Sequence, residues 1–237
     1  MQRLIDGHKH FLSDIFPQRK SQFKLLSDRQ QPEWLFITCA DSRVLPDLFL
    51  GTGPGDLFIS RIVGNVVPVS SQDVDGVAAT IEYAVEVLRV RDVIICGHSD
   101  CGAMKAALGH TALEGLPMAE RWLNHVEAAF QYRQPLNPAD GDGAELAALI
   151  RGNVVAQLQN LKVQPSVARA MGEGRLRIHG WYYDILSGRI EEFKFQAGGS
   201  QLPGNYFPRQ MQSRHYAGPH TQRRFCRHRL PFGHAHL

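Results

Sequence analysis

The chain has 237 residues, 43% of them hydrophobic, which is enough for one α/β domain with extensions. Its net charge of +3 is unevenly distributed: residues 200–237 carry six arginines and no lysine or acid, so residues 1–199 hold 20 basic against 23 acidic side chains. No apolar run approaches the ~20 residues that span a bilayer, and the start lacks the apolar stretch of a secretion signal. We therefore expect a cytoplasmic protein without membrane or nucleic-acid partners, whose four cysteines are ligands or core residues rather than disulfide partners.

Residues 1–30 predict a helical arm with a break at Pro17. An apolar stripe at helical spacing runs along this arm and consists of Leu4, His8, Phe11 and Ile15, with Ile5 and Leu12 beside them. The stripe precedes the first strand and must cover another surface, either on its own domain or on a second subunit. We take dimerisation as the role of the arm.

Three short runs rich in aromatic and β-branched residues predict strands buried on both faces, at 34–39, 57–61 and 92–97. A helix over 73–89, which Asp73 or Asp75 can cap, separates the second strand from the third. This alternation indicates βαβ units. The predicted fold class is therefore α/β, with a mostly parallel central β-sheet flanked by helices.

Two further helices are predicted at about 117–131 and 143–161. The runs 176–183 and 189–195 then flank Ser187-Gly188 and resemble a hairpin that adds edge strands. These elements complete a domain at 31–196.

Residues 197–237 form a basic, His/Arg-rich tail without periodicity, which predicts disorder. Loose metal binding by its histidines, or contact of its arginines with acidic partners, is a weaker interpretation.

Three candidate metal ligands are expected at one edge of the sheet. Cys39 ends the first strand, His98 follows the third, and Cys101 opens the next helix. The carboxyl ends of parallel strands converge on one edge, so these side chains can meet there. Two thiolates and one imidazole suit zinc, and three protein ligands leave the fourth tetrahedral position open, as in catalytic sites. Alone, Cys39 would be a core residue and His98 a loop histidine; their joint placement favours metal. Cys96 is assigned to the core.

Asp41 and Arg43 are a candidate acid–base pair. Alternation along an extended segment would place both on the same side as Cys39. A carboxylate beside zinc can become a fourth ligand, and an arginine that binds it bidentately keeps it available as a hydrogen-bond acceptor. The alternative is a surface ion pair, which contributes little energy.

The two segments together, CxDSR followed by HSxCG, resemble the β-class carbonic anhydrases over about residues 1–195. The resemblance implies one Zn²⁺ per subunit on Cys39, His98 and Cys101, with Asp41 and Arg43 as the catalytic dyad. It implies a carbonate dehydratase, a lyase that reversibly hydrates CO2 to bicarbonate and a proton by zinc-hydroxide attack. It also implies a homodimer or a higher homo-oligomer.

The same resemblance assigns a substrate pocket. Gln30 falls where one subgroup places a glutamine that orients bicarbonate, and further pocket positions, some acting across the dimer interface, fall on Phe58, Val63 and Tyr83. Phe36 stands where an allosterically regulated subgroup carries tryptophan. We therefore expect the unregulated, glutamine-containing subgroup.

Ile62 departs from the family pattern: it stands where asparagine commonly follows the arginine equivalent to Arg61, and the loss of that amide predicts a looser site. The chain looks most like bacterial and cyanobacterial members, some of which reside in carboxysomes. A carboxysomal location is therefore the alternative to free cytoplasm.

Two other functions remain open from the residues. A non-catalytic, zinc-stabilised scaffold of the same fold would bind zinc through four protein ligands and would not hydrate CO2. A hydrolase for a CO2-like substrate such as carbon disulfide would use the same site. The joint presence of Asp41, Arg43 and Gln30 argues against the scaffold, which has no use for that dyad.

Overall fold

The structure is a computed structural model that describes residues 1–69, 75–135, 143–193 and 208–210. It contains one sheet with the strand order β2-β1-β3-β4-β5-β6. β1 to β4 are mutually parallel, whereas β5 and β6 join antiparallel. The strands are β1 (Trp34–Thr38), β2 (Leu57–Arg61), β3 (Asp92–His98), β4 (Arg177–Tyr183), β5 (Ile190–Phe193) and β6 (Pro208–Gln210).

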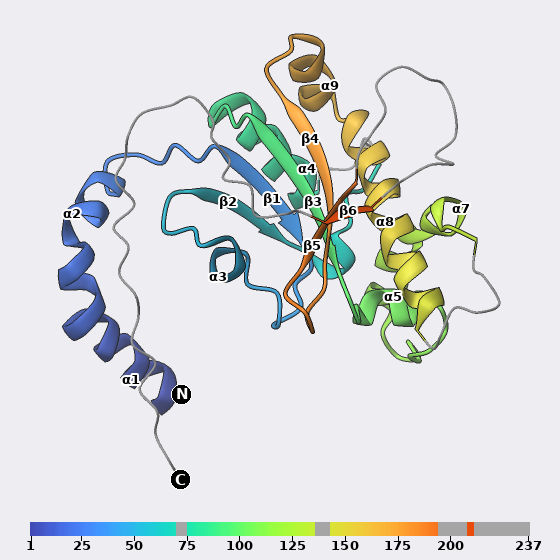
Figure 1. Cartoon of the computed structure of the whole chain (residues 1–237), viewed down its shortest axis with the longest axis horizontal. Coiled ribbons are helices and arrows are strands. Elements are labelled where there is room, and N and C mark those ends of the chain that lie inside the picture. The colour runs from blue at the N-terminus through green and yellow to red at the C-terminus, as the bar shows by residue number, and fades with distance from the viewer. Residues whose placement is uncertain (70–74, 136–142, 194–207, 211–237) are drawn as a thin grey trace.

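Helices flank this sheet, and an N-terminal helical arm extends away from it (Figure 1). The arm comprises α1 (Gln2–His10), the π-helical turn η1 (Phe11–Ile15) and α2 (Phe16–Leu26). The helices of the body are α3 (Pro46–Leu50), α4 (Gly76–Glu82) with its π-helical continuation η3 (Tyr83–Val87), α5 (Gly102–Ala107), α6 (Pro117–Leu123), α7 (Ala129–Tyr132), α8 (Ala144–Lys162) and α9 (Pro165–Gly172), with 3-10 turns at η2 (Val63–Asn65) and η4 (Asn124–Val126).

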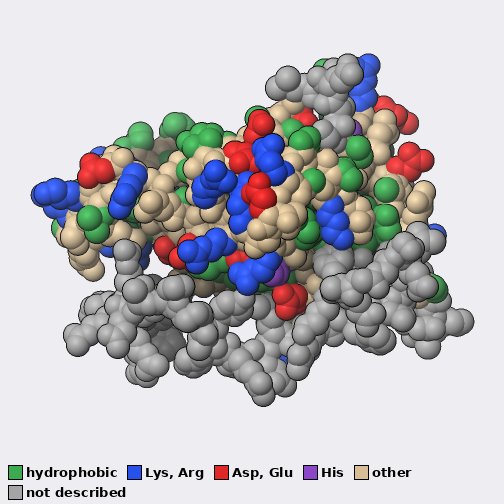
Figure 2. Space-filling model, turned by 90° about the horizontal axis from the view of Figure 1, so that it is seen from above, with side chains coloured by type: hydrophobic (Ala, Val, Ile, Leu, Met, Phe, Trp, Pro, Cys, Tyr) green, Lys and Arg blue, Asp and Glu red, His purple; other side chains and the backbone are tan. Residues whose placement is uncertain are grey.

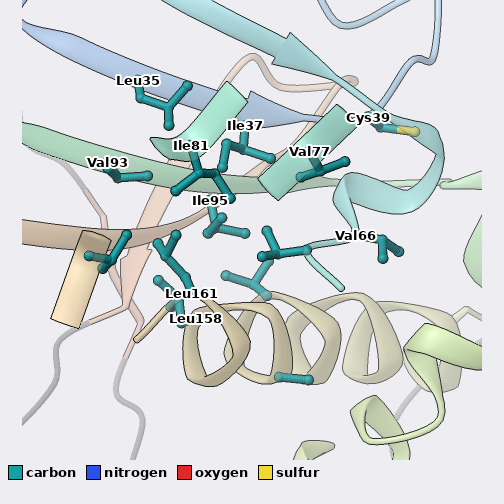
Figure 3. Close-up of a cluster of buried hydrophobic side chains, with 14 of the residues drawn as sticks. Leu35, Ile37, Cys39, Val66, Val77, Ile81, Val93, Ile95, Leu158 and Leu161 are labelled. Carbon is teal, nitrogen blue, oxygen red and sulfur yellow. The ribbon is translucent and has the colours of Figure 1, made fainter. Parts of the chain in front are cut away.

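The larger core lies between one face of the sheet and the helices α4, α8 and α9. Alternate residues of β1 and β3 point to this face because side chains alternate along a strand. Figure 3 shows them directed toward α8, with Cys39 at the carboxyl end of β1. The fully buried members include Leu35, Ile37, Val93, Ile95, Leu158 and Leu161.

The opposite face of the sheet carries a smaller aromatic cluster. Its buried members are Phe36, Ile94 and Cys96, and α3 contributes Phe49 and Leu50 to its rim. Burial raises the pKa of the Cys96 thiol to about 12. Cys96 is therefore an uncharged core residue on the face away from the site, as the sequence predicted.

Glycines let α8 approach both the sheet and α7. A Cβ on Gly97 of β3 would lie 2.8 Å from Val154, and one on Gly180 of β4 would lie 2.6 Å from Leu158. On α8 itself, a Cβ on Gly152 would lie 2.4 Å from the backbone oxygen of Ala129. Close packing is thus encoded by the absence of side chains at these contacts.

The arm leaves its apolar stripe uncovered by the described part of the chain. Leu4 is 70% exposed, Leu12 50% and Ile15 38%, and neither α1 nor α2 contains a buried residue. In Figure 2 the arm forms the left end of the molecule and shows hydrophobic side chains between charged ones. The stripe therefore does not pack on the described residues of its own domain.

The predicted parallel strands and the helices flanking them are present, with several differences in detail. The predicted break at Pro17 is wrong: Pro17 lies within the first turn of α2, where a missing N–H costs nothing, and the irregular turn is η1 before it. The helix predicted at 117–131 is divided into α6, η4 and α7, and α3 and α9 were not predicted.

The carboxyl-terminal strands also differ from prediction. β4 and β5 form the expected antiparallel pair. However, β4 is not an edge strand: it pairs in parallel with β3 on its other side and therefore lies inside the sheet. Of the tail expected to be disordered, only Pro208–Gln210 is described, and it forms the strand β6 against β5. Asp75 caps α4 by accepting hydrogen bonds from Val77 and Ala78 N–H, whereas Asp73 lies outside the described residues.

Replacement of Gly152 by alanine should destabilise the protein by about 1–3 kcal/mol, because the new methyl group meets backbone atoms that cannot move aside. Urea unfolding monitored by circular dichroism measures this change. The matched control is Gly172→Ala in α9, where nothing lies within 4 Å of the added Cβ, and which should be neutral or slightly stabilising. Equal stability of the Gly152→Ala protein and its parent would contradict this account of helix packing.

Candidate metal centre and active site

The structure brings the three predicted ligands together. Cys39 follows β1, His98 is the last residue of β3, and Cys101 caps the start of α5. Their ligand atoms all lie within 4.8 Å of one another, and all three residues are buried. His98 and Cys101 flank the Ser99–Asp100 turn between strand and helix.

The imidazole of His98 is oriented as a metal ligand. Its Nδ1 lies 2.9 Å from the Ser99 carbonyl oxygen, which can only accept, so Nδ1 carries the proton. In the neutral ring Nε2 then carries the lone pair, and this atom is fully buried without a hydrogen-bond partner. A buried polar atom without a partner costs free energy, and a cation between the three side chains would remove that cost.

The two thiols of the cluster also fit a divalent cation. A hydrogen bond from Cys101 is the main reason that the pKa of Cys39 falls to about 4, and the Gly64 N–H adds a donor 3.4 Å from its sulfur. The same hydrogen bond, with burial, raises the pKa of Cys101 well above its usual range. The pair thus releases one proton readily and retains the second. Binding of a doubly charged ion supplies the charge that releases the second proton.

Asp41 and Arg43 form a tight pair beside the ligands. Arg43 donates from Nε to Asp41 Oδ1 at 3.0 Å and from Nη2 to Oδ2 at 2.7 Å, and its backbone N–H donates to Oδ1 at 2.9 Å. Asp41 Oδ2 lies 3.9 Å from His98 Nε2. The hydrogen bonds from Arg43 hold the pKa of Asp41 far below its usual range, so this carboxylate accepts hydrogen bonds and does not carry a proton.

The pairing arises from a turn, so the prediction of an extended segment at 41–43 is wrong. Val44 N–H donates to the Asp41 carbonyl oxygen, which closes a turn over residues 41–44. The Asp41 side chain accepts from the backbone two residues ahead, a local bond that aspartate forms readily in turns. Arg61 of β2 donates to the carbonyl oxygens of Cys39 and Asp41 and so fixes the turn to the sheet.

A loop at residues 63–68, buried except for Val63, forms one wall of the site, and we call it the buried loop. It contains Gly64, whose N–H faces the Cys39 sulfur. Because residues 64–68 are buried outside any strand or long helix, their backbone groups need side-chain partners. Amide side chains supply them at 2.8–2.9 Å. Three come from α8: Asn153 donates to Gly64 O, Gln157 accepts from Val67 N–H, and Asn160 donates to Val67 O. The fourth, Gln164, is the N-cap residue of α9 and donates to Pro68 O.

Sequence reasoning missed these residues because the sequence does not indicate which group the amide side chain of an Asn or Gln will hydrogen-bond. Ile62, the departure from the family pattern, packs its side chain against the apolar core, and its N–H donates to Thr38 O at 2.9 Å. The loop that follows Ile62 is held by α8 instead.

The four predicted substrate-pocket residues are divided between two ends of the strands. Val63 begins the buried loop at the carboxyl end of β2. Phe58 instead pairs with Leu35 near the amino end of β1, which is about 13 Å along the strand from Cys39. Tyr83 lies with its ring 6.1 Å from that of Phe58.

Gln30 lies before the amino end of β1 and is exposed. Within the described residues of one chain, therefore, only Val63 of these four lies at the metal-ligand cluster.

Comparison with known proteins identifies the family. Residues 34–190 match the family described as carbonic anhydrase. A carbonic anhydrase of Pseudomonas aeruginosa is 49% identical over 191 residues, which cover 81% of this chain and 86% of the relative. The chain belongs to the carbonic anhydrase family.

Solved structures refine this assignment to the β class. The β-carbonic anhydrase CcaA matches with a TM-score of 0.75 and 35% identity, covering 82% of this chain and 95% of the other. A tetrameric β-carbonic anhydrase of Sordaria macrospora matches with a TM-score of 0.72 and 30% identity, covering 81% and 95%. β-Carbonic anhydrases are zinc enzymes, and the buried Cys–His–Cys cluster can hold one zinc ion. Among the described residues, no helix has the length and apolar character needed to cross a membrane.

His98→Ala and Cys39→Ser should each reduce bound zinc from about one ion per chain to nearly none, because two protein ligands hold the ion far less tightly than three. Metal analysis of the purified proteins measures this. Cys96→Ala is the matched control: Cys96 lies on the other face of the sheet and its removal should leave zinc content unchanged. A His98→Ala protein with a full complement of zinc would rule out His98 as a ligand.

Proposed function

We infer that this protein is a zinc-dependent carbonic anhydrase that catalyses the reversible hydration of CO2 to bicarbonate and a proton. The observation that supports this most strongly is the buried cluster of Cys39, His98 and Cys101 beside a carboxylate that an arginine binds bidentately. Three protein ligands leave a position for water, as catalytic zinc sites require. We propose these three as the zinc ligands, and Asp41 and Arg43 as the catalytic dyad.

Zinc, when bound, supplies the Lewis acidity that makes water a nucleophile near neutral pH. The residues of the chain then orient the reaction. Asp41 is held ionised by Arg43 and can accept a hydrogen bond from the attacking nucleophile, which directs its lone pair at the carbon of CO2. Arg43 also keeps Asp41 from turning toward the metal, to which its carboxylate is a competing ligand.

The two other candidate functions have less support. A zinc-stabilised scaffold predicts four protein ligands, whereas the cluster among the described residues contains three. A hydrolase of carbon disulfide would share the same site, and only a substrate assay separates it from CO2 hydration. The named relatives are carbonic anhydrases, which favours CO2.

We propose that Gln30, Phe58 and Tyr83 act in the site of a second subunit. All three lie toward the amino ends of the strands, away from the metal ligands of their own chain. A homodimer, or a higher homo-oligomer built from it, would bring them to a neighbour's site, and the uncovered stripe of the arm offers a surface for that assembly. The tetramers of the Sordaria macrospora relative support a homo-oligomer.

Assignment to the unregulated, glutamine-containing subgroup rests on Gln30 and on Phe36, which is fully buried in the aromatic cluster. A cytoplasmic location, the carboxysomal alternative and a role in carbon utilization stay predictions.

Arg43→Ala should retain zinc but lower the rate of CO2 hydration by roughly 100-fold, because Asp41 is released to coordinate the ion. Stopped-flow CO2 hydration and metal analysis on the same preparation test this. Arg169→Ala serves as control, since it also removes an arginine paired with a carboxylate, Glu86, but far from the site. Full activity of Arg43→Ala would refute the dyad.

Co-expression of two impaired variants tests whether Gln30 serves the neighbouring subunit. A dimer of one Asp41→Asn and one Gln30→Ala subunit would contain one site with every native residue, so a random mixture should recover roughly a quarter of the native sites. Co-expression of Asp41→Asn with Arg43→Ala is the control, because both residues belong to the same site and no native site can form. If the first mixture recovered no more activity than the second, Gln30 would act within its own chain or not at all.

A further inference from the structure

Asp100 stands between two of the proposed ligands in an unusual backbone conformation. It occupies the variable position of HSxCG, between His98 and Cys101, with φ at +60°. Side-chain residues rarely adopt this left-handed conformation, and aspartate and asparagine tolerate it best after glycine. It allows one residue to present its carboxylate and its own carbonyl oxygen to the same partner, which is Arg43.

The guanidinium of Arg43 is therefore held on two edges. Nε and Nη2 donate to Asp41, as described above, while Nη1 donates to Asp100 Oδ2 at 2.9 Å and Nη2 to Asp100 O at 3.1 Å. Lys105 of α5 contacts the other oxygen of the Asp100 carboxylate. Through Asp100, the Asp41–Arg43 pair is therefore anchored to the turn between His98 and Cys101.

These contacts are too exposed to serve chiefly in stability. The side chain of Asp100 is 51% exposed and that of Arg43 is 44% exposed, and ion pairs of this kind contribute little to folding. Their geometric effect is larger. If Arg43 were bound by Asp41 alone, the Asp41 carboxylate and the Arg43 guanidinium could move together toward the metal position. The distance is short, because Asp41 Oδ2 lies only 3.9 Å from the His98 nitrogen that would face the metal.

We propose that Asp100 is a positioning residue for the reaction: it anchors Arg43 to the ligand-bearing turn, so that Asp41 stays paired with the guanidinium and does not become a fourth zinc ligand. The role rests on the proposed function, and it extends the dyad by a residue that touches neither substrate nor metal.

Asp100→Gly is the decisive variant, because glycine accepts φ of +60° without strain and removes only the carboxylate. It should keep zinc and lower kcat for CO2 hydration by roughly tenfold, with little change in KM. Asp100→Asn preserves size and backbone tolerance and can still accept a weaker hydrogen bond, so it should lose less. The matched control is Glu173→Ala, which removes an equally exposed carboxylate, at 50%, from a pair with Arg175 remote from the site.

Two readouts separate positioning from a structural role. In the cobalt-substituted protein, the visible spectrum of Asp100→Gly should move toward that of Arg43→Ala, in which Asp41 is free to bind the metal. In the Arg43→Ala background, Asp100→Gly should cause no further loss of rate, since its effect passes through Arg43. Full kcat with an unchanged cobalt spectrum, or an equal loss in both backgrounds, would overturn the proposal.

The two hypotheses fail separately. If the unaltered enzyme did not hydrate CO2, the proposed function would be refuted, while the cobalt spectra would still decide whether Asp100 controls coordination by Asp41.

Discussion

The site depends on the side-by-side parallel pairing of β1 and β3. The register places Thr38 opposite Cys96, so Cys39, one residue after Thr38, and His98, two residues after Cys96, emerge at the same edge of the sheet. Parallel strands require a long crossover, and the chain between them supplies β2, the buried loop and α4 before it returns as β3. A shift of that register by one residue would turn every side chain of β1 to the opposite face. It would move the buried set of Leu35 and Ile37 away from α8.

At this edge of the sheet, the side chains that can bind a cation differ from those that form the acid–base pair. The thiol pair and the bare imidazole nitrogen form a buried site that favours a cation, as their hydrogen bonding shows. Asp41 lies at the border between this interior and solvent, where Arg43 balances its charge. Arg43 also binds Asp100. The carboxylates of Asp41 and Asp100 would repel each other if Arg43 were absent, and the shared guanidinium makes their proximity favourable. On the proposed function, recognition of the ion and orientation of the reactants therefore belong to adjacent but separate side chains.

Much of this was predictable because strand ends and ligand chemistry are local signals. Buried runs located β1 and β3, and parallel topology then required Cys39 and His98 to meet. The turn at 41–44 was missed because alternation assumes an extended chain, whereas an aspartate side chain can bond its own backbone. The amides of α8 were missed for a different reason. Asn153 and Gln157 are buried and bond a loop about ninety positions away, and no periodicity in the sequence indicates such a partner. The sequence likewise could not show that Gln30 lies before the amino end of β1, away from the metal ligands of its own chain.

The hydrogen bonds between amide side chains and the buried loop have a mechanical consequence. Three of the four amide side chains lie on successive turns of α8, the fourth, Gln164, is the N-cap residue of α9, and each binds a backbone group of the loop. The loop belongs to no strand, so these side-chain bonds are what satisfies most of its buried backbone groups. A ligand that displaced residues 64–68 would therefore have to break these hydrogen bonds or shift α8, a helix of 19 residues.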